Sequence, residues 1–111
     1  MSPRLAEIAS AIENEFPILS FEHGRIDKIS FDDVEEVERE WIGYDYLREQ
    51  MSMFVKRRFS GRAASVARLI CQVHAGRIRE KIIAAELEYA CRRELVSQLT
   101  TVFPQFHVPL M

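Results

Sequence analysis

The sequence predicts a mainly α-helical fold: a bundle of three to four helices, with residues 1–111 as a single helical domain. Apolar residues recur at three- and four-residue spacing over most of the chain, which is the period of an amphipathic helix. Glycine and proline, the residues that interrupt helices, number only 4 each. With 48% hydrophobic residues, a chain of this length can bury one core unaided. No cofactor is predicted, because the sequence carries no motif that would bind one.

The first helix is expected to begin at Ser2, an N-cap residue, with Pro3 at the first helical position. Its apolar residues recur at helical spacing: Leu5, Ile8 and Ile12. The helix should end at Phe16, because Pro17 disfavours helical backbone in the residue before it.

Residues 18–29 lack helical periodicity and predict a short N-terminal β-hairpin. A two-residue turn at residues 23–24 would set Ile18 opposite Ile29. An irregular loop is the alternative. Because an isolated hairpin is marginal in water, this segment is expected to lie on the helices.

The clearest helix comes next, with Ser30 or Asp32 as its cap. Carboxylates fill its first turns and residues 56–58 place three cations near its end, and both placements complement the helix dipole. Its apolar stripe comprises Val34, Val37, Trp41, Tyr44, Leu47, Met51 and Phe54. Gly43 costs about 1 kcal/mol relative to alanine inside a helix, which indicates a close approach by another helix.

Ser60 and Gly61 interrupt the pattern, and Ser60 is predicted to cap a third helix over about residues 62–75. The apolar side of this helix comprises Val66, Leu69, Ile70 and Val73. Gly76 is expected to end it as a C-terminal cap residue.

A fourth helix is predicted over about residues 77–101. Its apolar positions are Ile78, Ile82, Ala85, Leu87, Cys91, Leu95 and Leu99. Alternatively, the third and fourth helices form one rod of about 40 residues, near 60 Å long, which would almost demand a second chain. The apolar, proline-broken tail at residues 103–111 is expected to fold back over the bundle or to dock into another molecule.

Charge is unevenly distributed along the chain. Residues 1–50 carry 13 carboxylates and 5 cations, whereas residues 51–111 carry 4 carboxylates and 10 cations. Residues 50–79 contain seven cations and no carboxylate. Such asymmetry indicates either a charged partner or two segments that neutralise each other after folding, as when an acidic helix lies antiparallel to a basic one.

Motifs for nucleotide or metal chemistry are absent from the sequence: no glycine-rich phosphate loop, dinucleotide fingerprint or paired-cysteine motif occurs. Cys71 and Cys91 are too few for a disulfide scaffold and are interpreted as small buried apolar residues. Cys71 and His74 would share a helix face, but zinc needs more ligands than these two.

Membrane association is not expected. No apolar run approaches the roughly 18 residues that a membrane span needs. Residues 1–11 lack the apolar segment of a signal peptide, so the expected location is cytoplasmic.

One short motif resembles that of a known family. Arg68 and His74 are separated by five residues, which is similar to the Arg-x4–6-His motif of HEPN ribonucleases, small helical bundles that dimerise across their active site. The resemblance implies RNA cleavage, with Arg68 and His74 in a composite site. Leu69 follows the arginine where the family usually has a polar residue, and a regular helix would leave the two side chains about 120° apart.

We therefore expect a non-enzymatic, homodimeric adaptor, inhibitor or regulator that binds another protein through a charge-polarised surface. The alternatives are nucleic-acid binding through the basic segment at residues 56–79, with Phe54 and Phe59 stacking on bases, and a HEPN-like ribonuclease. Tyr46 lies off the apolar stripe of its helix and is predicted to be exposed. The candidate partner-binding residues are Asp32, Asp33, Glu36, Glu40, Tyr46, Lys56, Arg57, Arg58, Arg62 and Arg68.

Overall fold

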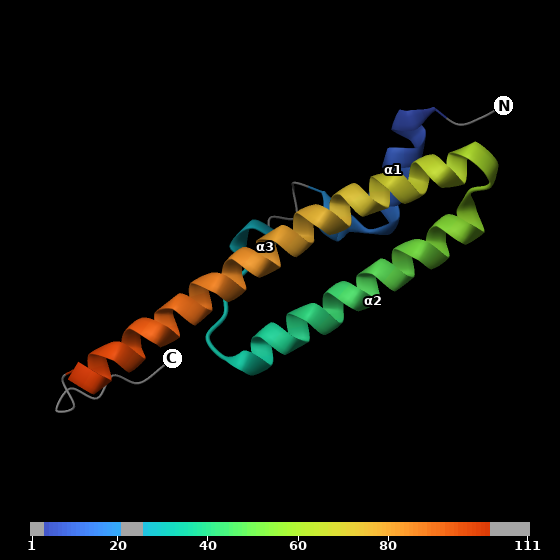
Figure 1. The fold of residues 1–111 in the computed structure, drawn as a ribbon. Helices are drawn as coiled ribbons and strands as arrows, with labels where there is room; N and C mark the ends of the chain where they lie inside the picture. The colour runs from blue at the N-terminus through green and yellow to red at the C-terminus, as the bar shows by residue number, and fades with distance from the viewer. Residues whose placement is uncertain (1–3, 21–25, 103–111) are drawn as a thin grey trace.

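A long antiparallel pair of helices dominates the fold (Figure 1). The computed structural model describes residues 4–20 and 26–102, which are mainly helical. Helix α1 spans Leu5–Glu15, α2 spans Val34–Arg58 and α3 spans Gly61–Val102. Two short 3-10 helices, η1 at Pro17–Leu19 and η3 at Ile26–Lys28, lie between α1 and α2.

The α3 helix is the continuous rod that the sequence left open as an alternative to two shorter helices. Its 42 residues give a length of about 63 Å at 1.5 Å per residue. The predicted C-terminal cap at Gly76 is wrong, because α3 runs through this residue. The radius of gyration is 19.2 Å, against about 13 Å for a compact domain of 100 residues, so the molecule is a rod.

One core cluster joins α1, α2 and α3. Helix α1 lies against α3 (Figure 1), where it buries Ile8 and Ile12 and leaves Leu5 64% exposed. It ends before Pro17 as predicted, and the Phe16 ring meets the Phe54 ring of α2 edge to face at 5.6 Å. The predicted start at Ser2 lies outside the described residues.

The predicted β-hairpin at residues 18–29 is wrong for the residues that the structure describes, none of which is in a strand. Ile18 lies in η1 and the segment Ile26–Lys28 forms η3, while residues 21–25 lie outside the description. Burial of Leu19 and Ile26 against the helices replaces a cross-strand ladder. The expectation that this segment lies on the helices is confirmed.

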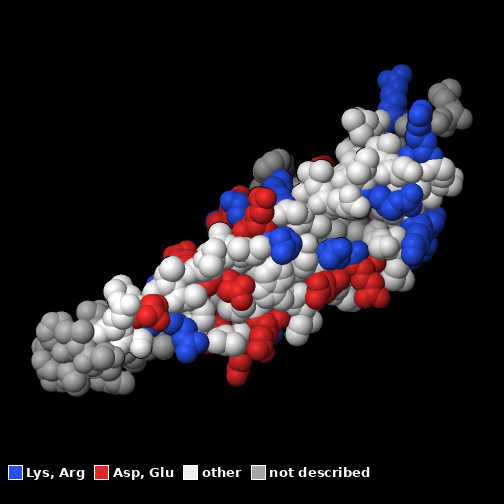
Figure 2. Space-filling view, in the orientation of Figure 1, with Lys and Arg blue, Asp and Glu red and all other residues white. Residues whose placement is uncertain are grey.

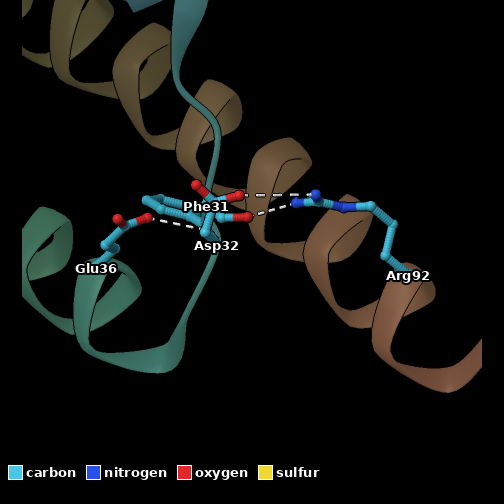
Figure 3. A network of polar contacts seen from close by, with 4 residues as sticks. All are labelled: Phe31, Asp32, Glu36 and Arg92. Atoms are coloured by element: carbon cyan, nitrogen blue, oxygen red, sulfur yellow. Dashed lines mark hydrogen bonds and ion pairs between the residues drawn. The ribbon is translucent and has the colours of Figure 1, made fainter. Parts of the chain in front are cut away.

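The start of α2 is held from two directions (Figure 3). The Asp33 side chain accepts a hydrogen bond from the Glu36 backbone N–H at 2.7 Å, so Asp33 is the cap, and not Ser30 or Asp32 as predicted. Glu36 in turn accepts from the Asp32 backbone N–H at 2.8 Å. From α3, the Arg92 guanidinium donates to the Phe31 carbonyl and lies 4.0 Å from the Asp32 carboxylate.

The inward face of α2 largely follows the predicted stripe, but that of α3 does not. In α2, Val37, Tyr44, Met51 and Phe54 are buried. In the first half of α3, the buried residues are small: Ala64, Ala67, Cys71 and Ala75. Of the predicted apolar side of this segment, Val66 and Ile70 are half-buried against the core, whereas Leu69 and Val73 face solvent, with exposed fractions of 62% and 73%. Bulky α2 side chains pack against small α3 side chains, which brings the two helices together closely.

The structure corrects the predictions for Cys91 and Gly43 and shows the backbone conformation of Gly61. Cys91 is exposed, so only Cys71 behaves as a small buried apolar residue. Gly43 does not mark a close approach, because a Cβ at this position would meet nothing within 4 Å. Gly61 has a φ of +58°, a backbone conformation that favours glycine, and it allows the short turn from α2 into α3.

Candidate interaction surface

The turn between α2 and α3 gathers cations at one end of the rod. Because the helices are antiparallel, Lys56, Arg57 and Arg58 at the end of α2 lie near Arg62 at the start of α3. All four side chains are exposed, and none forms an ion pair with a carboxylate of the described residues. Figure 2 shows this blue cluster at the turn, and we call these four residues the basic end.

A small groove lies between α2 and α3. Val55 lines it and adjoins Lys56 in the chain, but none of the four basic-end residues lines it. The groove has a volume of about 190 Å³. Met51, Val55, Cys71 and Ala75 contribute apolar surface, and Arg48, Ser52, Arg68 and Gln72 contribute polar groups. The Arg48 guanidinium lies 5.8 Å from the centre of the Tyr44 ring, and Arg68 donates to the Ser65 hydroxyl at 3.3 Å. Two guanidinium groups therefore lie beside an apolar floor, with no carboxylate among the lining residues.

The candidate acidic residues lie at the opposite end of α2, and most of them support the fold. Asp33 caps α2, Asp32 pairs with Arg92, and Glu36 accepts a backbone hydrogen bond. Asp32, Glu36 and Glu40 also line a second groove of about 510 Å³. Lys28 and Arg39 line it too, so its charge is mixed.

The two segments of opposite charge neutralise each other only in part along the rod, through the pairs Lys81–Asp27 and Arg92–Asp32. Antiparallel packing sets the basic end of α2 beside the basic start of α3, and the acidic start of α2 beside Arg92. Among the described residues, Lys81 pairs with Asp27 at 3.3 Å, and this pair is also remote from the basic end. The excess of cations therefore persists at the basic end of the folded surface, whereas red and blue side chains are mixed over the rest of the face that Figure 2 shows.

Arg68 and His74 do not converge on one site in the described part of the chain. Arg68 lines the groove between α2 and α3, whereas His74 is half-buried near Glu13 of α1. Burial lowers the pKa of His74, the Arg77 cation lowers it further, and Glu13 opposes both effects. The two side chains thus lie on different sides of α3, as the helical period requires.

The geometry does not favour a metal centre or a reactive thiol at Cys71. Burial raises the pKa of this thiol, which keeps it protonated near neutral pH. No group of three or more potential metal-ligating side chains occurs among the described residues.

Tyr46 is 63% exposed, as predicted, and lies on the side of α2 that faces away from the core. Ile42 and Met53 share that side, with exposed fractions of 68% and 45%. The tyrosine is therefore remote from the groove between α2 and α3.

Comparison with known proteins finds no family model, curated protein or solved structure that matches this chain. Among the described residues, no helix combines the length and apolar character that crossing a membrane requires.

Sequence reasoning missed two features of this surface. Arg48 and Gln72 were not singled out, because their position beside the groove depends on how α2 and α3 pack. Leu69 and Val73 were assigned to the inward side of their helix. The spacing of Ala64, Ala67, Cys71 and Ala75 was the available signal for the true inward face.

Proposed function

We propose that this chain is a small, non-enzymatic helical adaptor or regulator that binds an acidic segment of another protein at its basic end. The observation that carries the proposal is the gathering of Lys56, Arg57, Arg58 and Arg62, all exposed, with no carboxylate partner among the described residues. Four cations in one place attract an anionic partner and accelerate its association.

The groove beside the basic end supports an acidic protein segment as the partner. Arg48 and Arg68 can each hold a carboxylate through two hydrogen bonds. Met51 and Val55 offer apolar contact to the rest of the same segment. A peptide supplies both kinds of group in alternation, and interfaces typically bury apolar side chains inside a polar rim.

The charge of the remaining surface disfavours a nucleic acid as the partner. The chain carries a formal net charge of −2, and residues 32–49 contain eight carboxylates and two cations. A long phosphate backbone that followed the rod away from the basic end would meet these carboxylates, whereas a short acidic peptide segment would not.

Capture of partners from nuclease-treated native lysate tests this proposal. The tagged chain should retain a protein that survives nuclease treatment, and the double variant Arg57→Glu/Arg62→Glu should lose it by a factor of about 10 or more. The matched control is Arg39→Glu/Arg79→Glu, which changes net charge equally at exposed positions outside the basic end and should retain the partner.

Two results would contradict the proposal. Equal capture by both double variants would show that the basic end is not the binding surface. Loss of all captured material on nuclease treatment, with steeply salt-dependent binding of the purified chain to plain RNA or DNA, would favour the nucleic-acid alternative.

A further inference from the structure

A second apolar stripe follows α3 on the side opposite the core. It occupies positions spaced by three and four residues, all exposed: Leu69, Val73, Gly76, Glu80, Ala84, Leu87, Cys91 and Leu95. We call this stripe the outer face of α3. Its large members are strongly exposed, with fractions of 62% for Leu69, 73% for Val73 and 61% for Leu87. A helix with apolar stripes on two sides is expected to pack on both.

The far part of α3 meets the rest of the described chain mainly at its near end, where Glu86 accepts a hydrogen bond from Trp41, Tyr89 packs on the core and Arg92 donates to the Phe31 carbonyl. No α3 residue from 86 to 98 is buried, and the end of the helix projects beyond the start of α2 (Figure 1). Leu95 is 58% exposed there. A helical segment without a buried residue gains little from packing within the described part of the chain, so another chain alongside would stabilise it.

We propose that the outer face of α3 packs against the same face of a second copy, with the two α3 helices antiparallel. The outer-face positions are nearly symmetric about Ile82: they lie 13, 9, 6 and 2 residues before it and 2, 5, 9 and 13 residues after it. A two-fold axis that passes the outer face at the level of Ile82 along the helix therefore places this face against the same face of the second copy, as a closed dimer requires.

The residues brought together by this axis are complementary. Leu69 lies opposite Leu95 of the second copy, and Val73 lies opposite Cys91. Gly76 accommodates Leu87, which gives a role to a helical glycine at which an added Cβ would meet no neighbouring element within 4 Å among the described residues. Glu80 lies opposite Ala84, so the one charged position of the outer face does not meet its own copy.

Charge selects the antiparallel orientation over the parallel one. Residues 61–79 of α3 carry Arg62, Arg68, Arg77 and Arg79 with no carboxylate, and a parallel pair would set these cations side by side. In the antiparallel pair they lie alongside residues 85–102 of the second copy, where the three carboxylates Glu86, Glu88 and Glu94 outnumber the two cations Arg92 and Arg93. Opposite charges across an interface fix its orientation.

Sedimentation of the purified full chain tests the second copy as the occupant. The wild-type chain should sediment at twice its mass of 12.9 kDa at concentrations of about 1 to about 100 µM. Val73→Glu should weaken dimerisation by about 100-fold, because it places a charge in the interface. Circular dichroism should remain helical, since Val73 does not touch the core.

The matched control is Ile42→Glu, which adds the same charge at an equally exposed apolar position of α2 and should leave the dimer intact. A wild-type chain that stays monomeric up to the highest concentration would overturn the proposal. So would loss of the dimer in the Ile42 variant alone.

A cysteine variant tests the orientation. In the antiparallel dimer, Val73→Cys places a thiol opposite the native, exposed Cys91 of the second copy. A short bismaleimide should then join position 73 to position 91 between chains, as mapped by mass spectrometry, and the wild-type chain should not crosslink. Crosslinks that join 91 to 91 in the wild type would indicate the parallel arrangement and overturn the antiparallel one.

Discussion

Charged side chains at the start of α2 stabilise the fold, whereas those at its end are exposed to solvent. At its start, Asp33 supplies a side-chain cap, and Arg92 of α3 holds the Phe31 carbonyl and the Asp32 carboxylate (Figure 3). At its end, Arg57 and Arg58 are exposed cations that form no ion pair with the described carboxylates. Replacing residues at the start should therefore reduce stability, and replacing residues at the end should reduce binding.

Asp33→Ala should lower the free energy of unfolding by about 1 kcal/mol, because an orphan N–H group at the start of α2 loses its acceptor. Ser30→Ala is the matched control: it removes the cap predicted from the sequence and should change stability by less than about 0.5 kcal/mol. Urea unfolding at one protein concentration measures both. An equal decrease in the free energy of unfolding in both variants would show that the Asp33 cap does not stabilise α2.

Stability should fall in mild acid because of His74. Its folded pKa lies below the unfolded value of 6.5, so the unfolded state takes up a proton more readily. The stability present above pH 6.5 is therefore lost as the pH falls through the folded pKa. Urea midpoints between about pH 8 and about pH 5 measure this loss, and His74→Gln should reduce it. An unchanged profile in the variant would assign the loss to other groups.

At the scale of elements, the packing of α2 on α3 depends on one tight turn and on a difference in side-chain size: the inward residues of α2 are large, and those in the first half of α3 are small. Gly61 makes the turn with a φ of +58°. Large residues of α2, such as Met51 and Phe54, meet small residues of α3, such as Ala67 and Cys71. The larger apolar residues of α3 are left on its outer face, where burial of each leucine or valine would contribute about 1.5–3 kcal/mol.

The two α2–α3 glycines should respond to alanine with opposite signs. Gly61→Ala should destabilise the chain by about 1 kcal/mol or more, because an L side chain is strained at that φ. Gly43→Ala should stabilise it by up to about 1 kcal/mol, because the position is helical and open to solvent. Thermal unfolding of the two variants distinguishes these effects. Destabilisation by Gly43→Ala would reveal a close neighbour at that site.

At the scale of the whole molecule, the rod separates the basic end, proposed to bind a partner, from the outer face of α3, proposed to bind a second copy. The molecule measures 71 × 22 × 15 Å, with the basic end at the α2–α3 turn and the outer face of α3 along its length. An antiparallel pair of rods would carry one basic end at each extremity. Two sites on one dimer can raise the apparent affinity for a multivalent partner by about 100-fold or more.

The affinity for the acidic partner and the affinity between the two copies should depend differently on salt concentration. Binding at the basic end is electrostatic, so capture of the acidic partner should weaken between about 50 and about 500 mM salt. Dimerisation through the outer face is mainly apolar and should change by less than about threefold over the same range. Sedimentation and partner capture at each salt concentration measure both. A dimer that dissociates in salt would indicate that charge, and not the apolar stripe, holds it.

Local sequence patterns determined the helical class of this protein, the inward stripe of α2 and the end of α1 before Pro17. They also determined the charge polarity, because residues 56–58 and Arg62 are joined by a turn too short to separate them. These features depend on neighbouring residues and on the helical period, which the amino-acid order contains directly.

Only the tertiary structure decided which side of α3 faces the core. Leu69 and Val73 form as regular a stripe as Ala64 and Ala67, so periodicity in one helix cannot choose between them. The choice depends on volume across the seam: the bulky side chains of α2 leave room for alanines and not for a second row of large residues. The groove between Arg48 and Arg68 follows from the same packing and was therefore beyond local prediction.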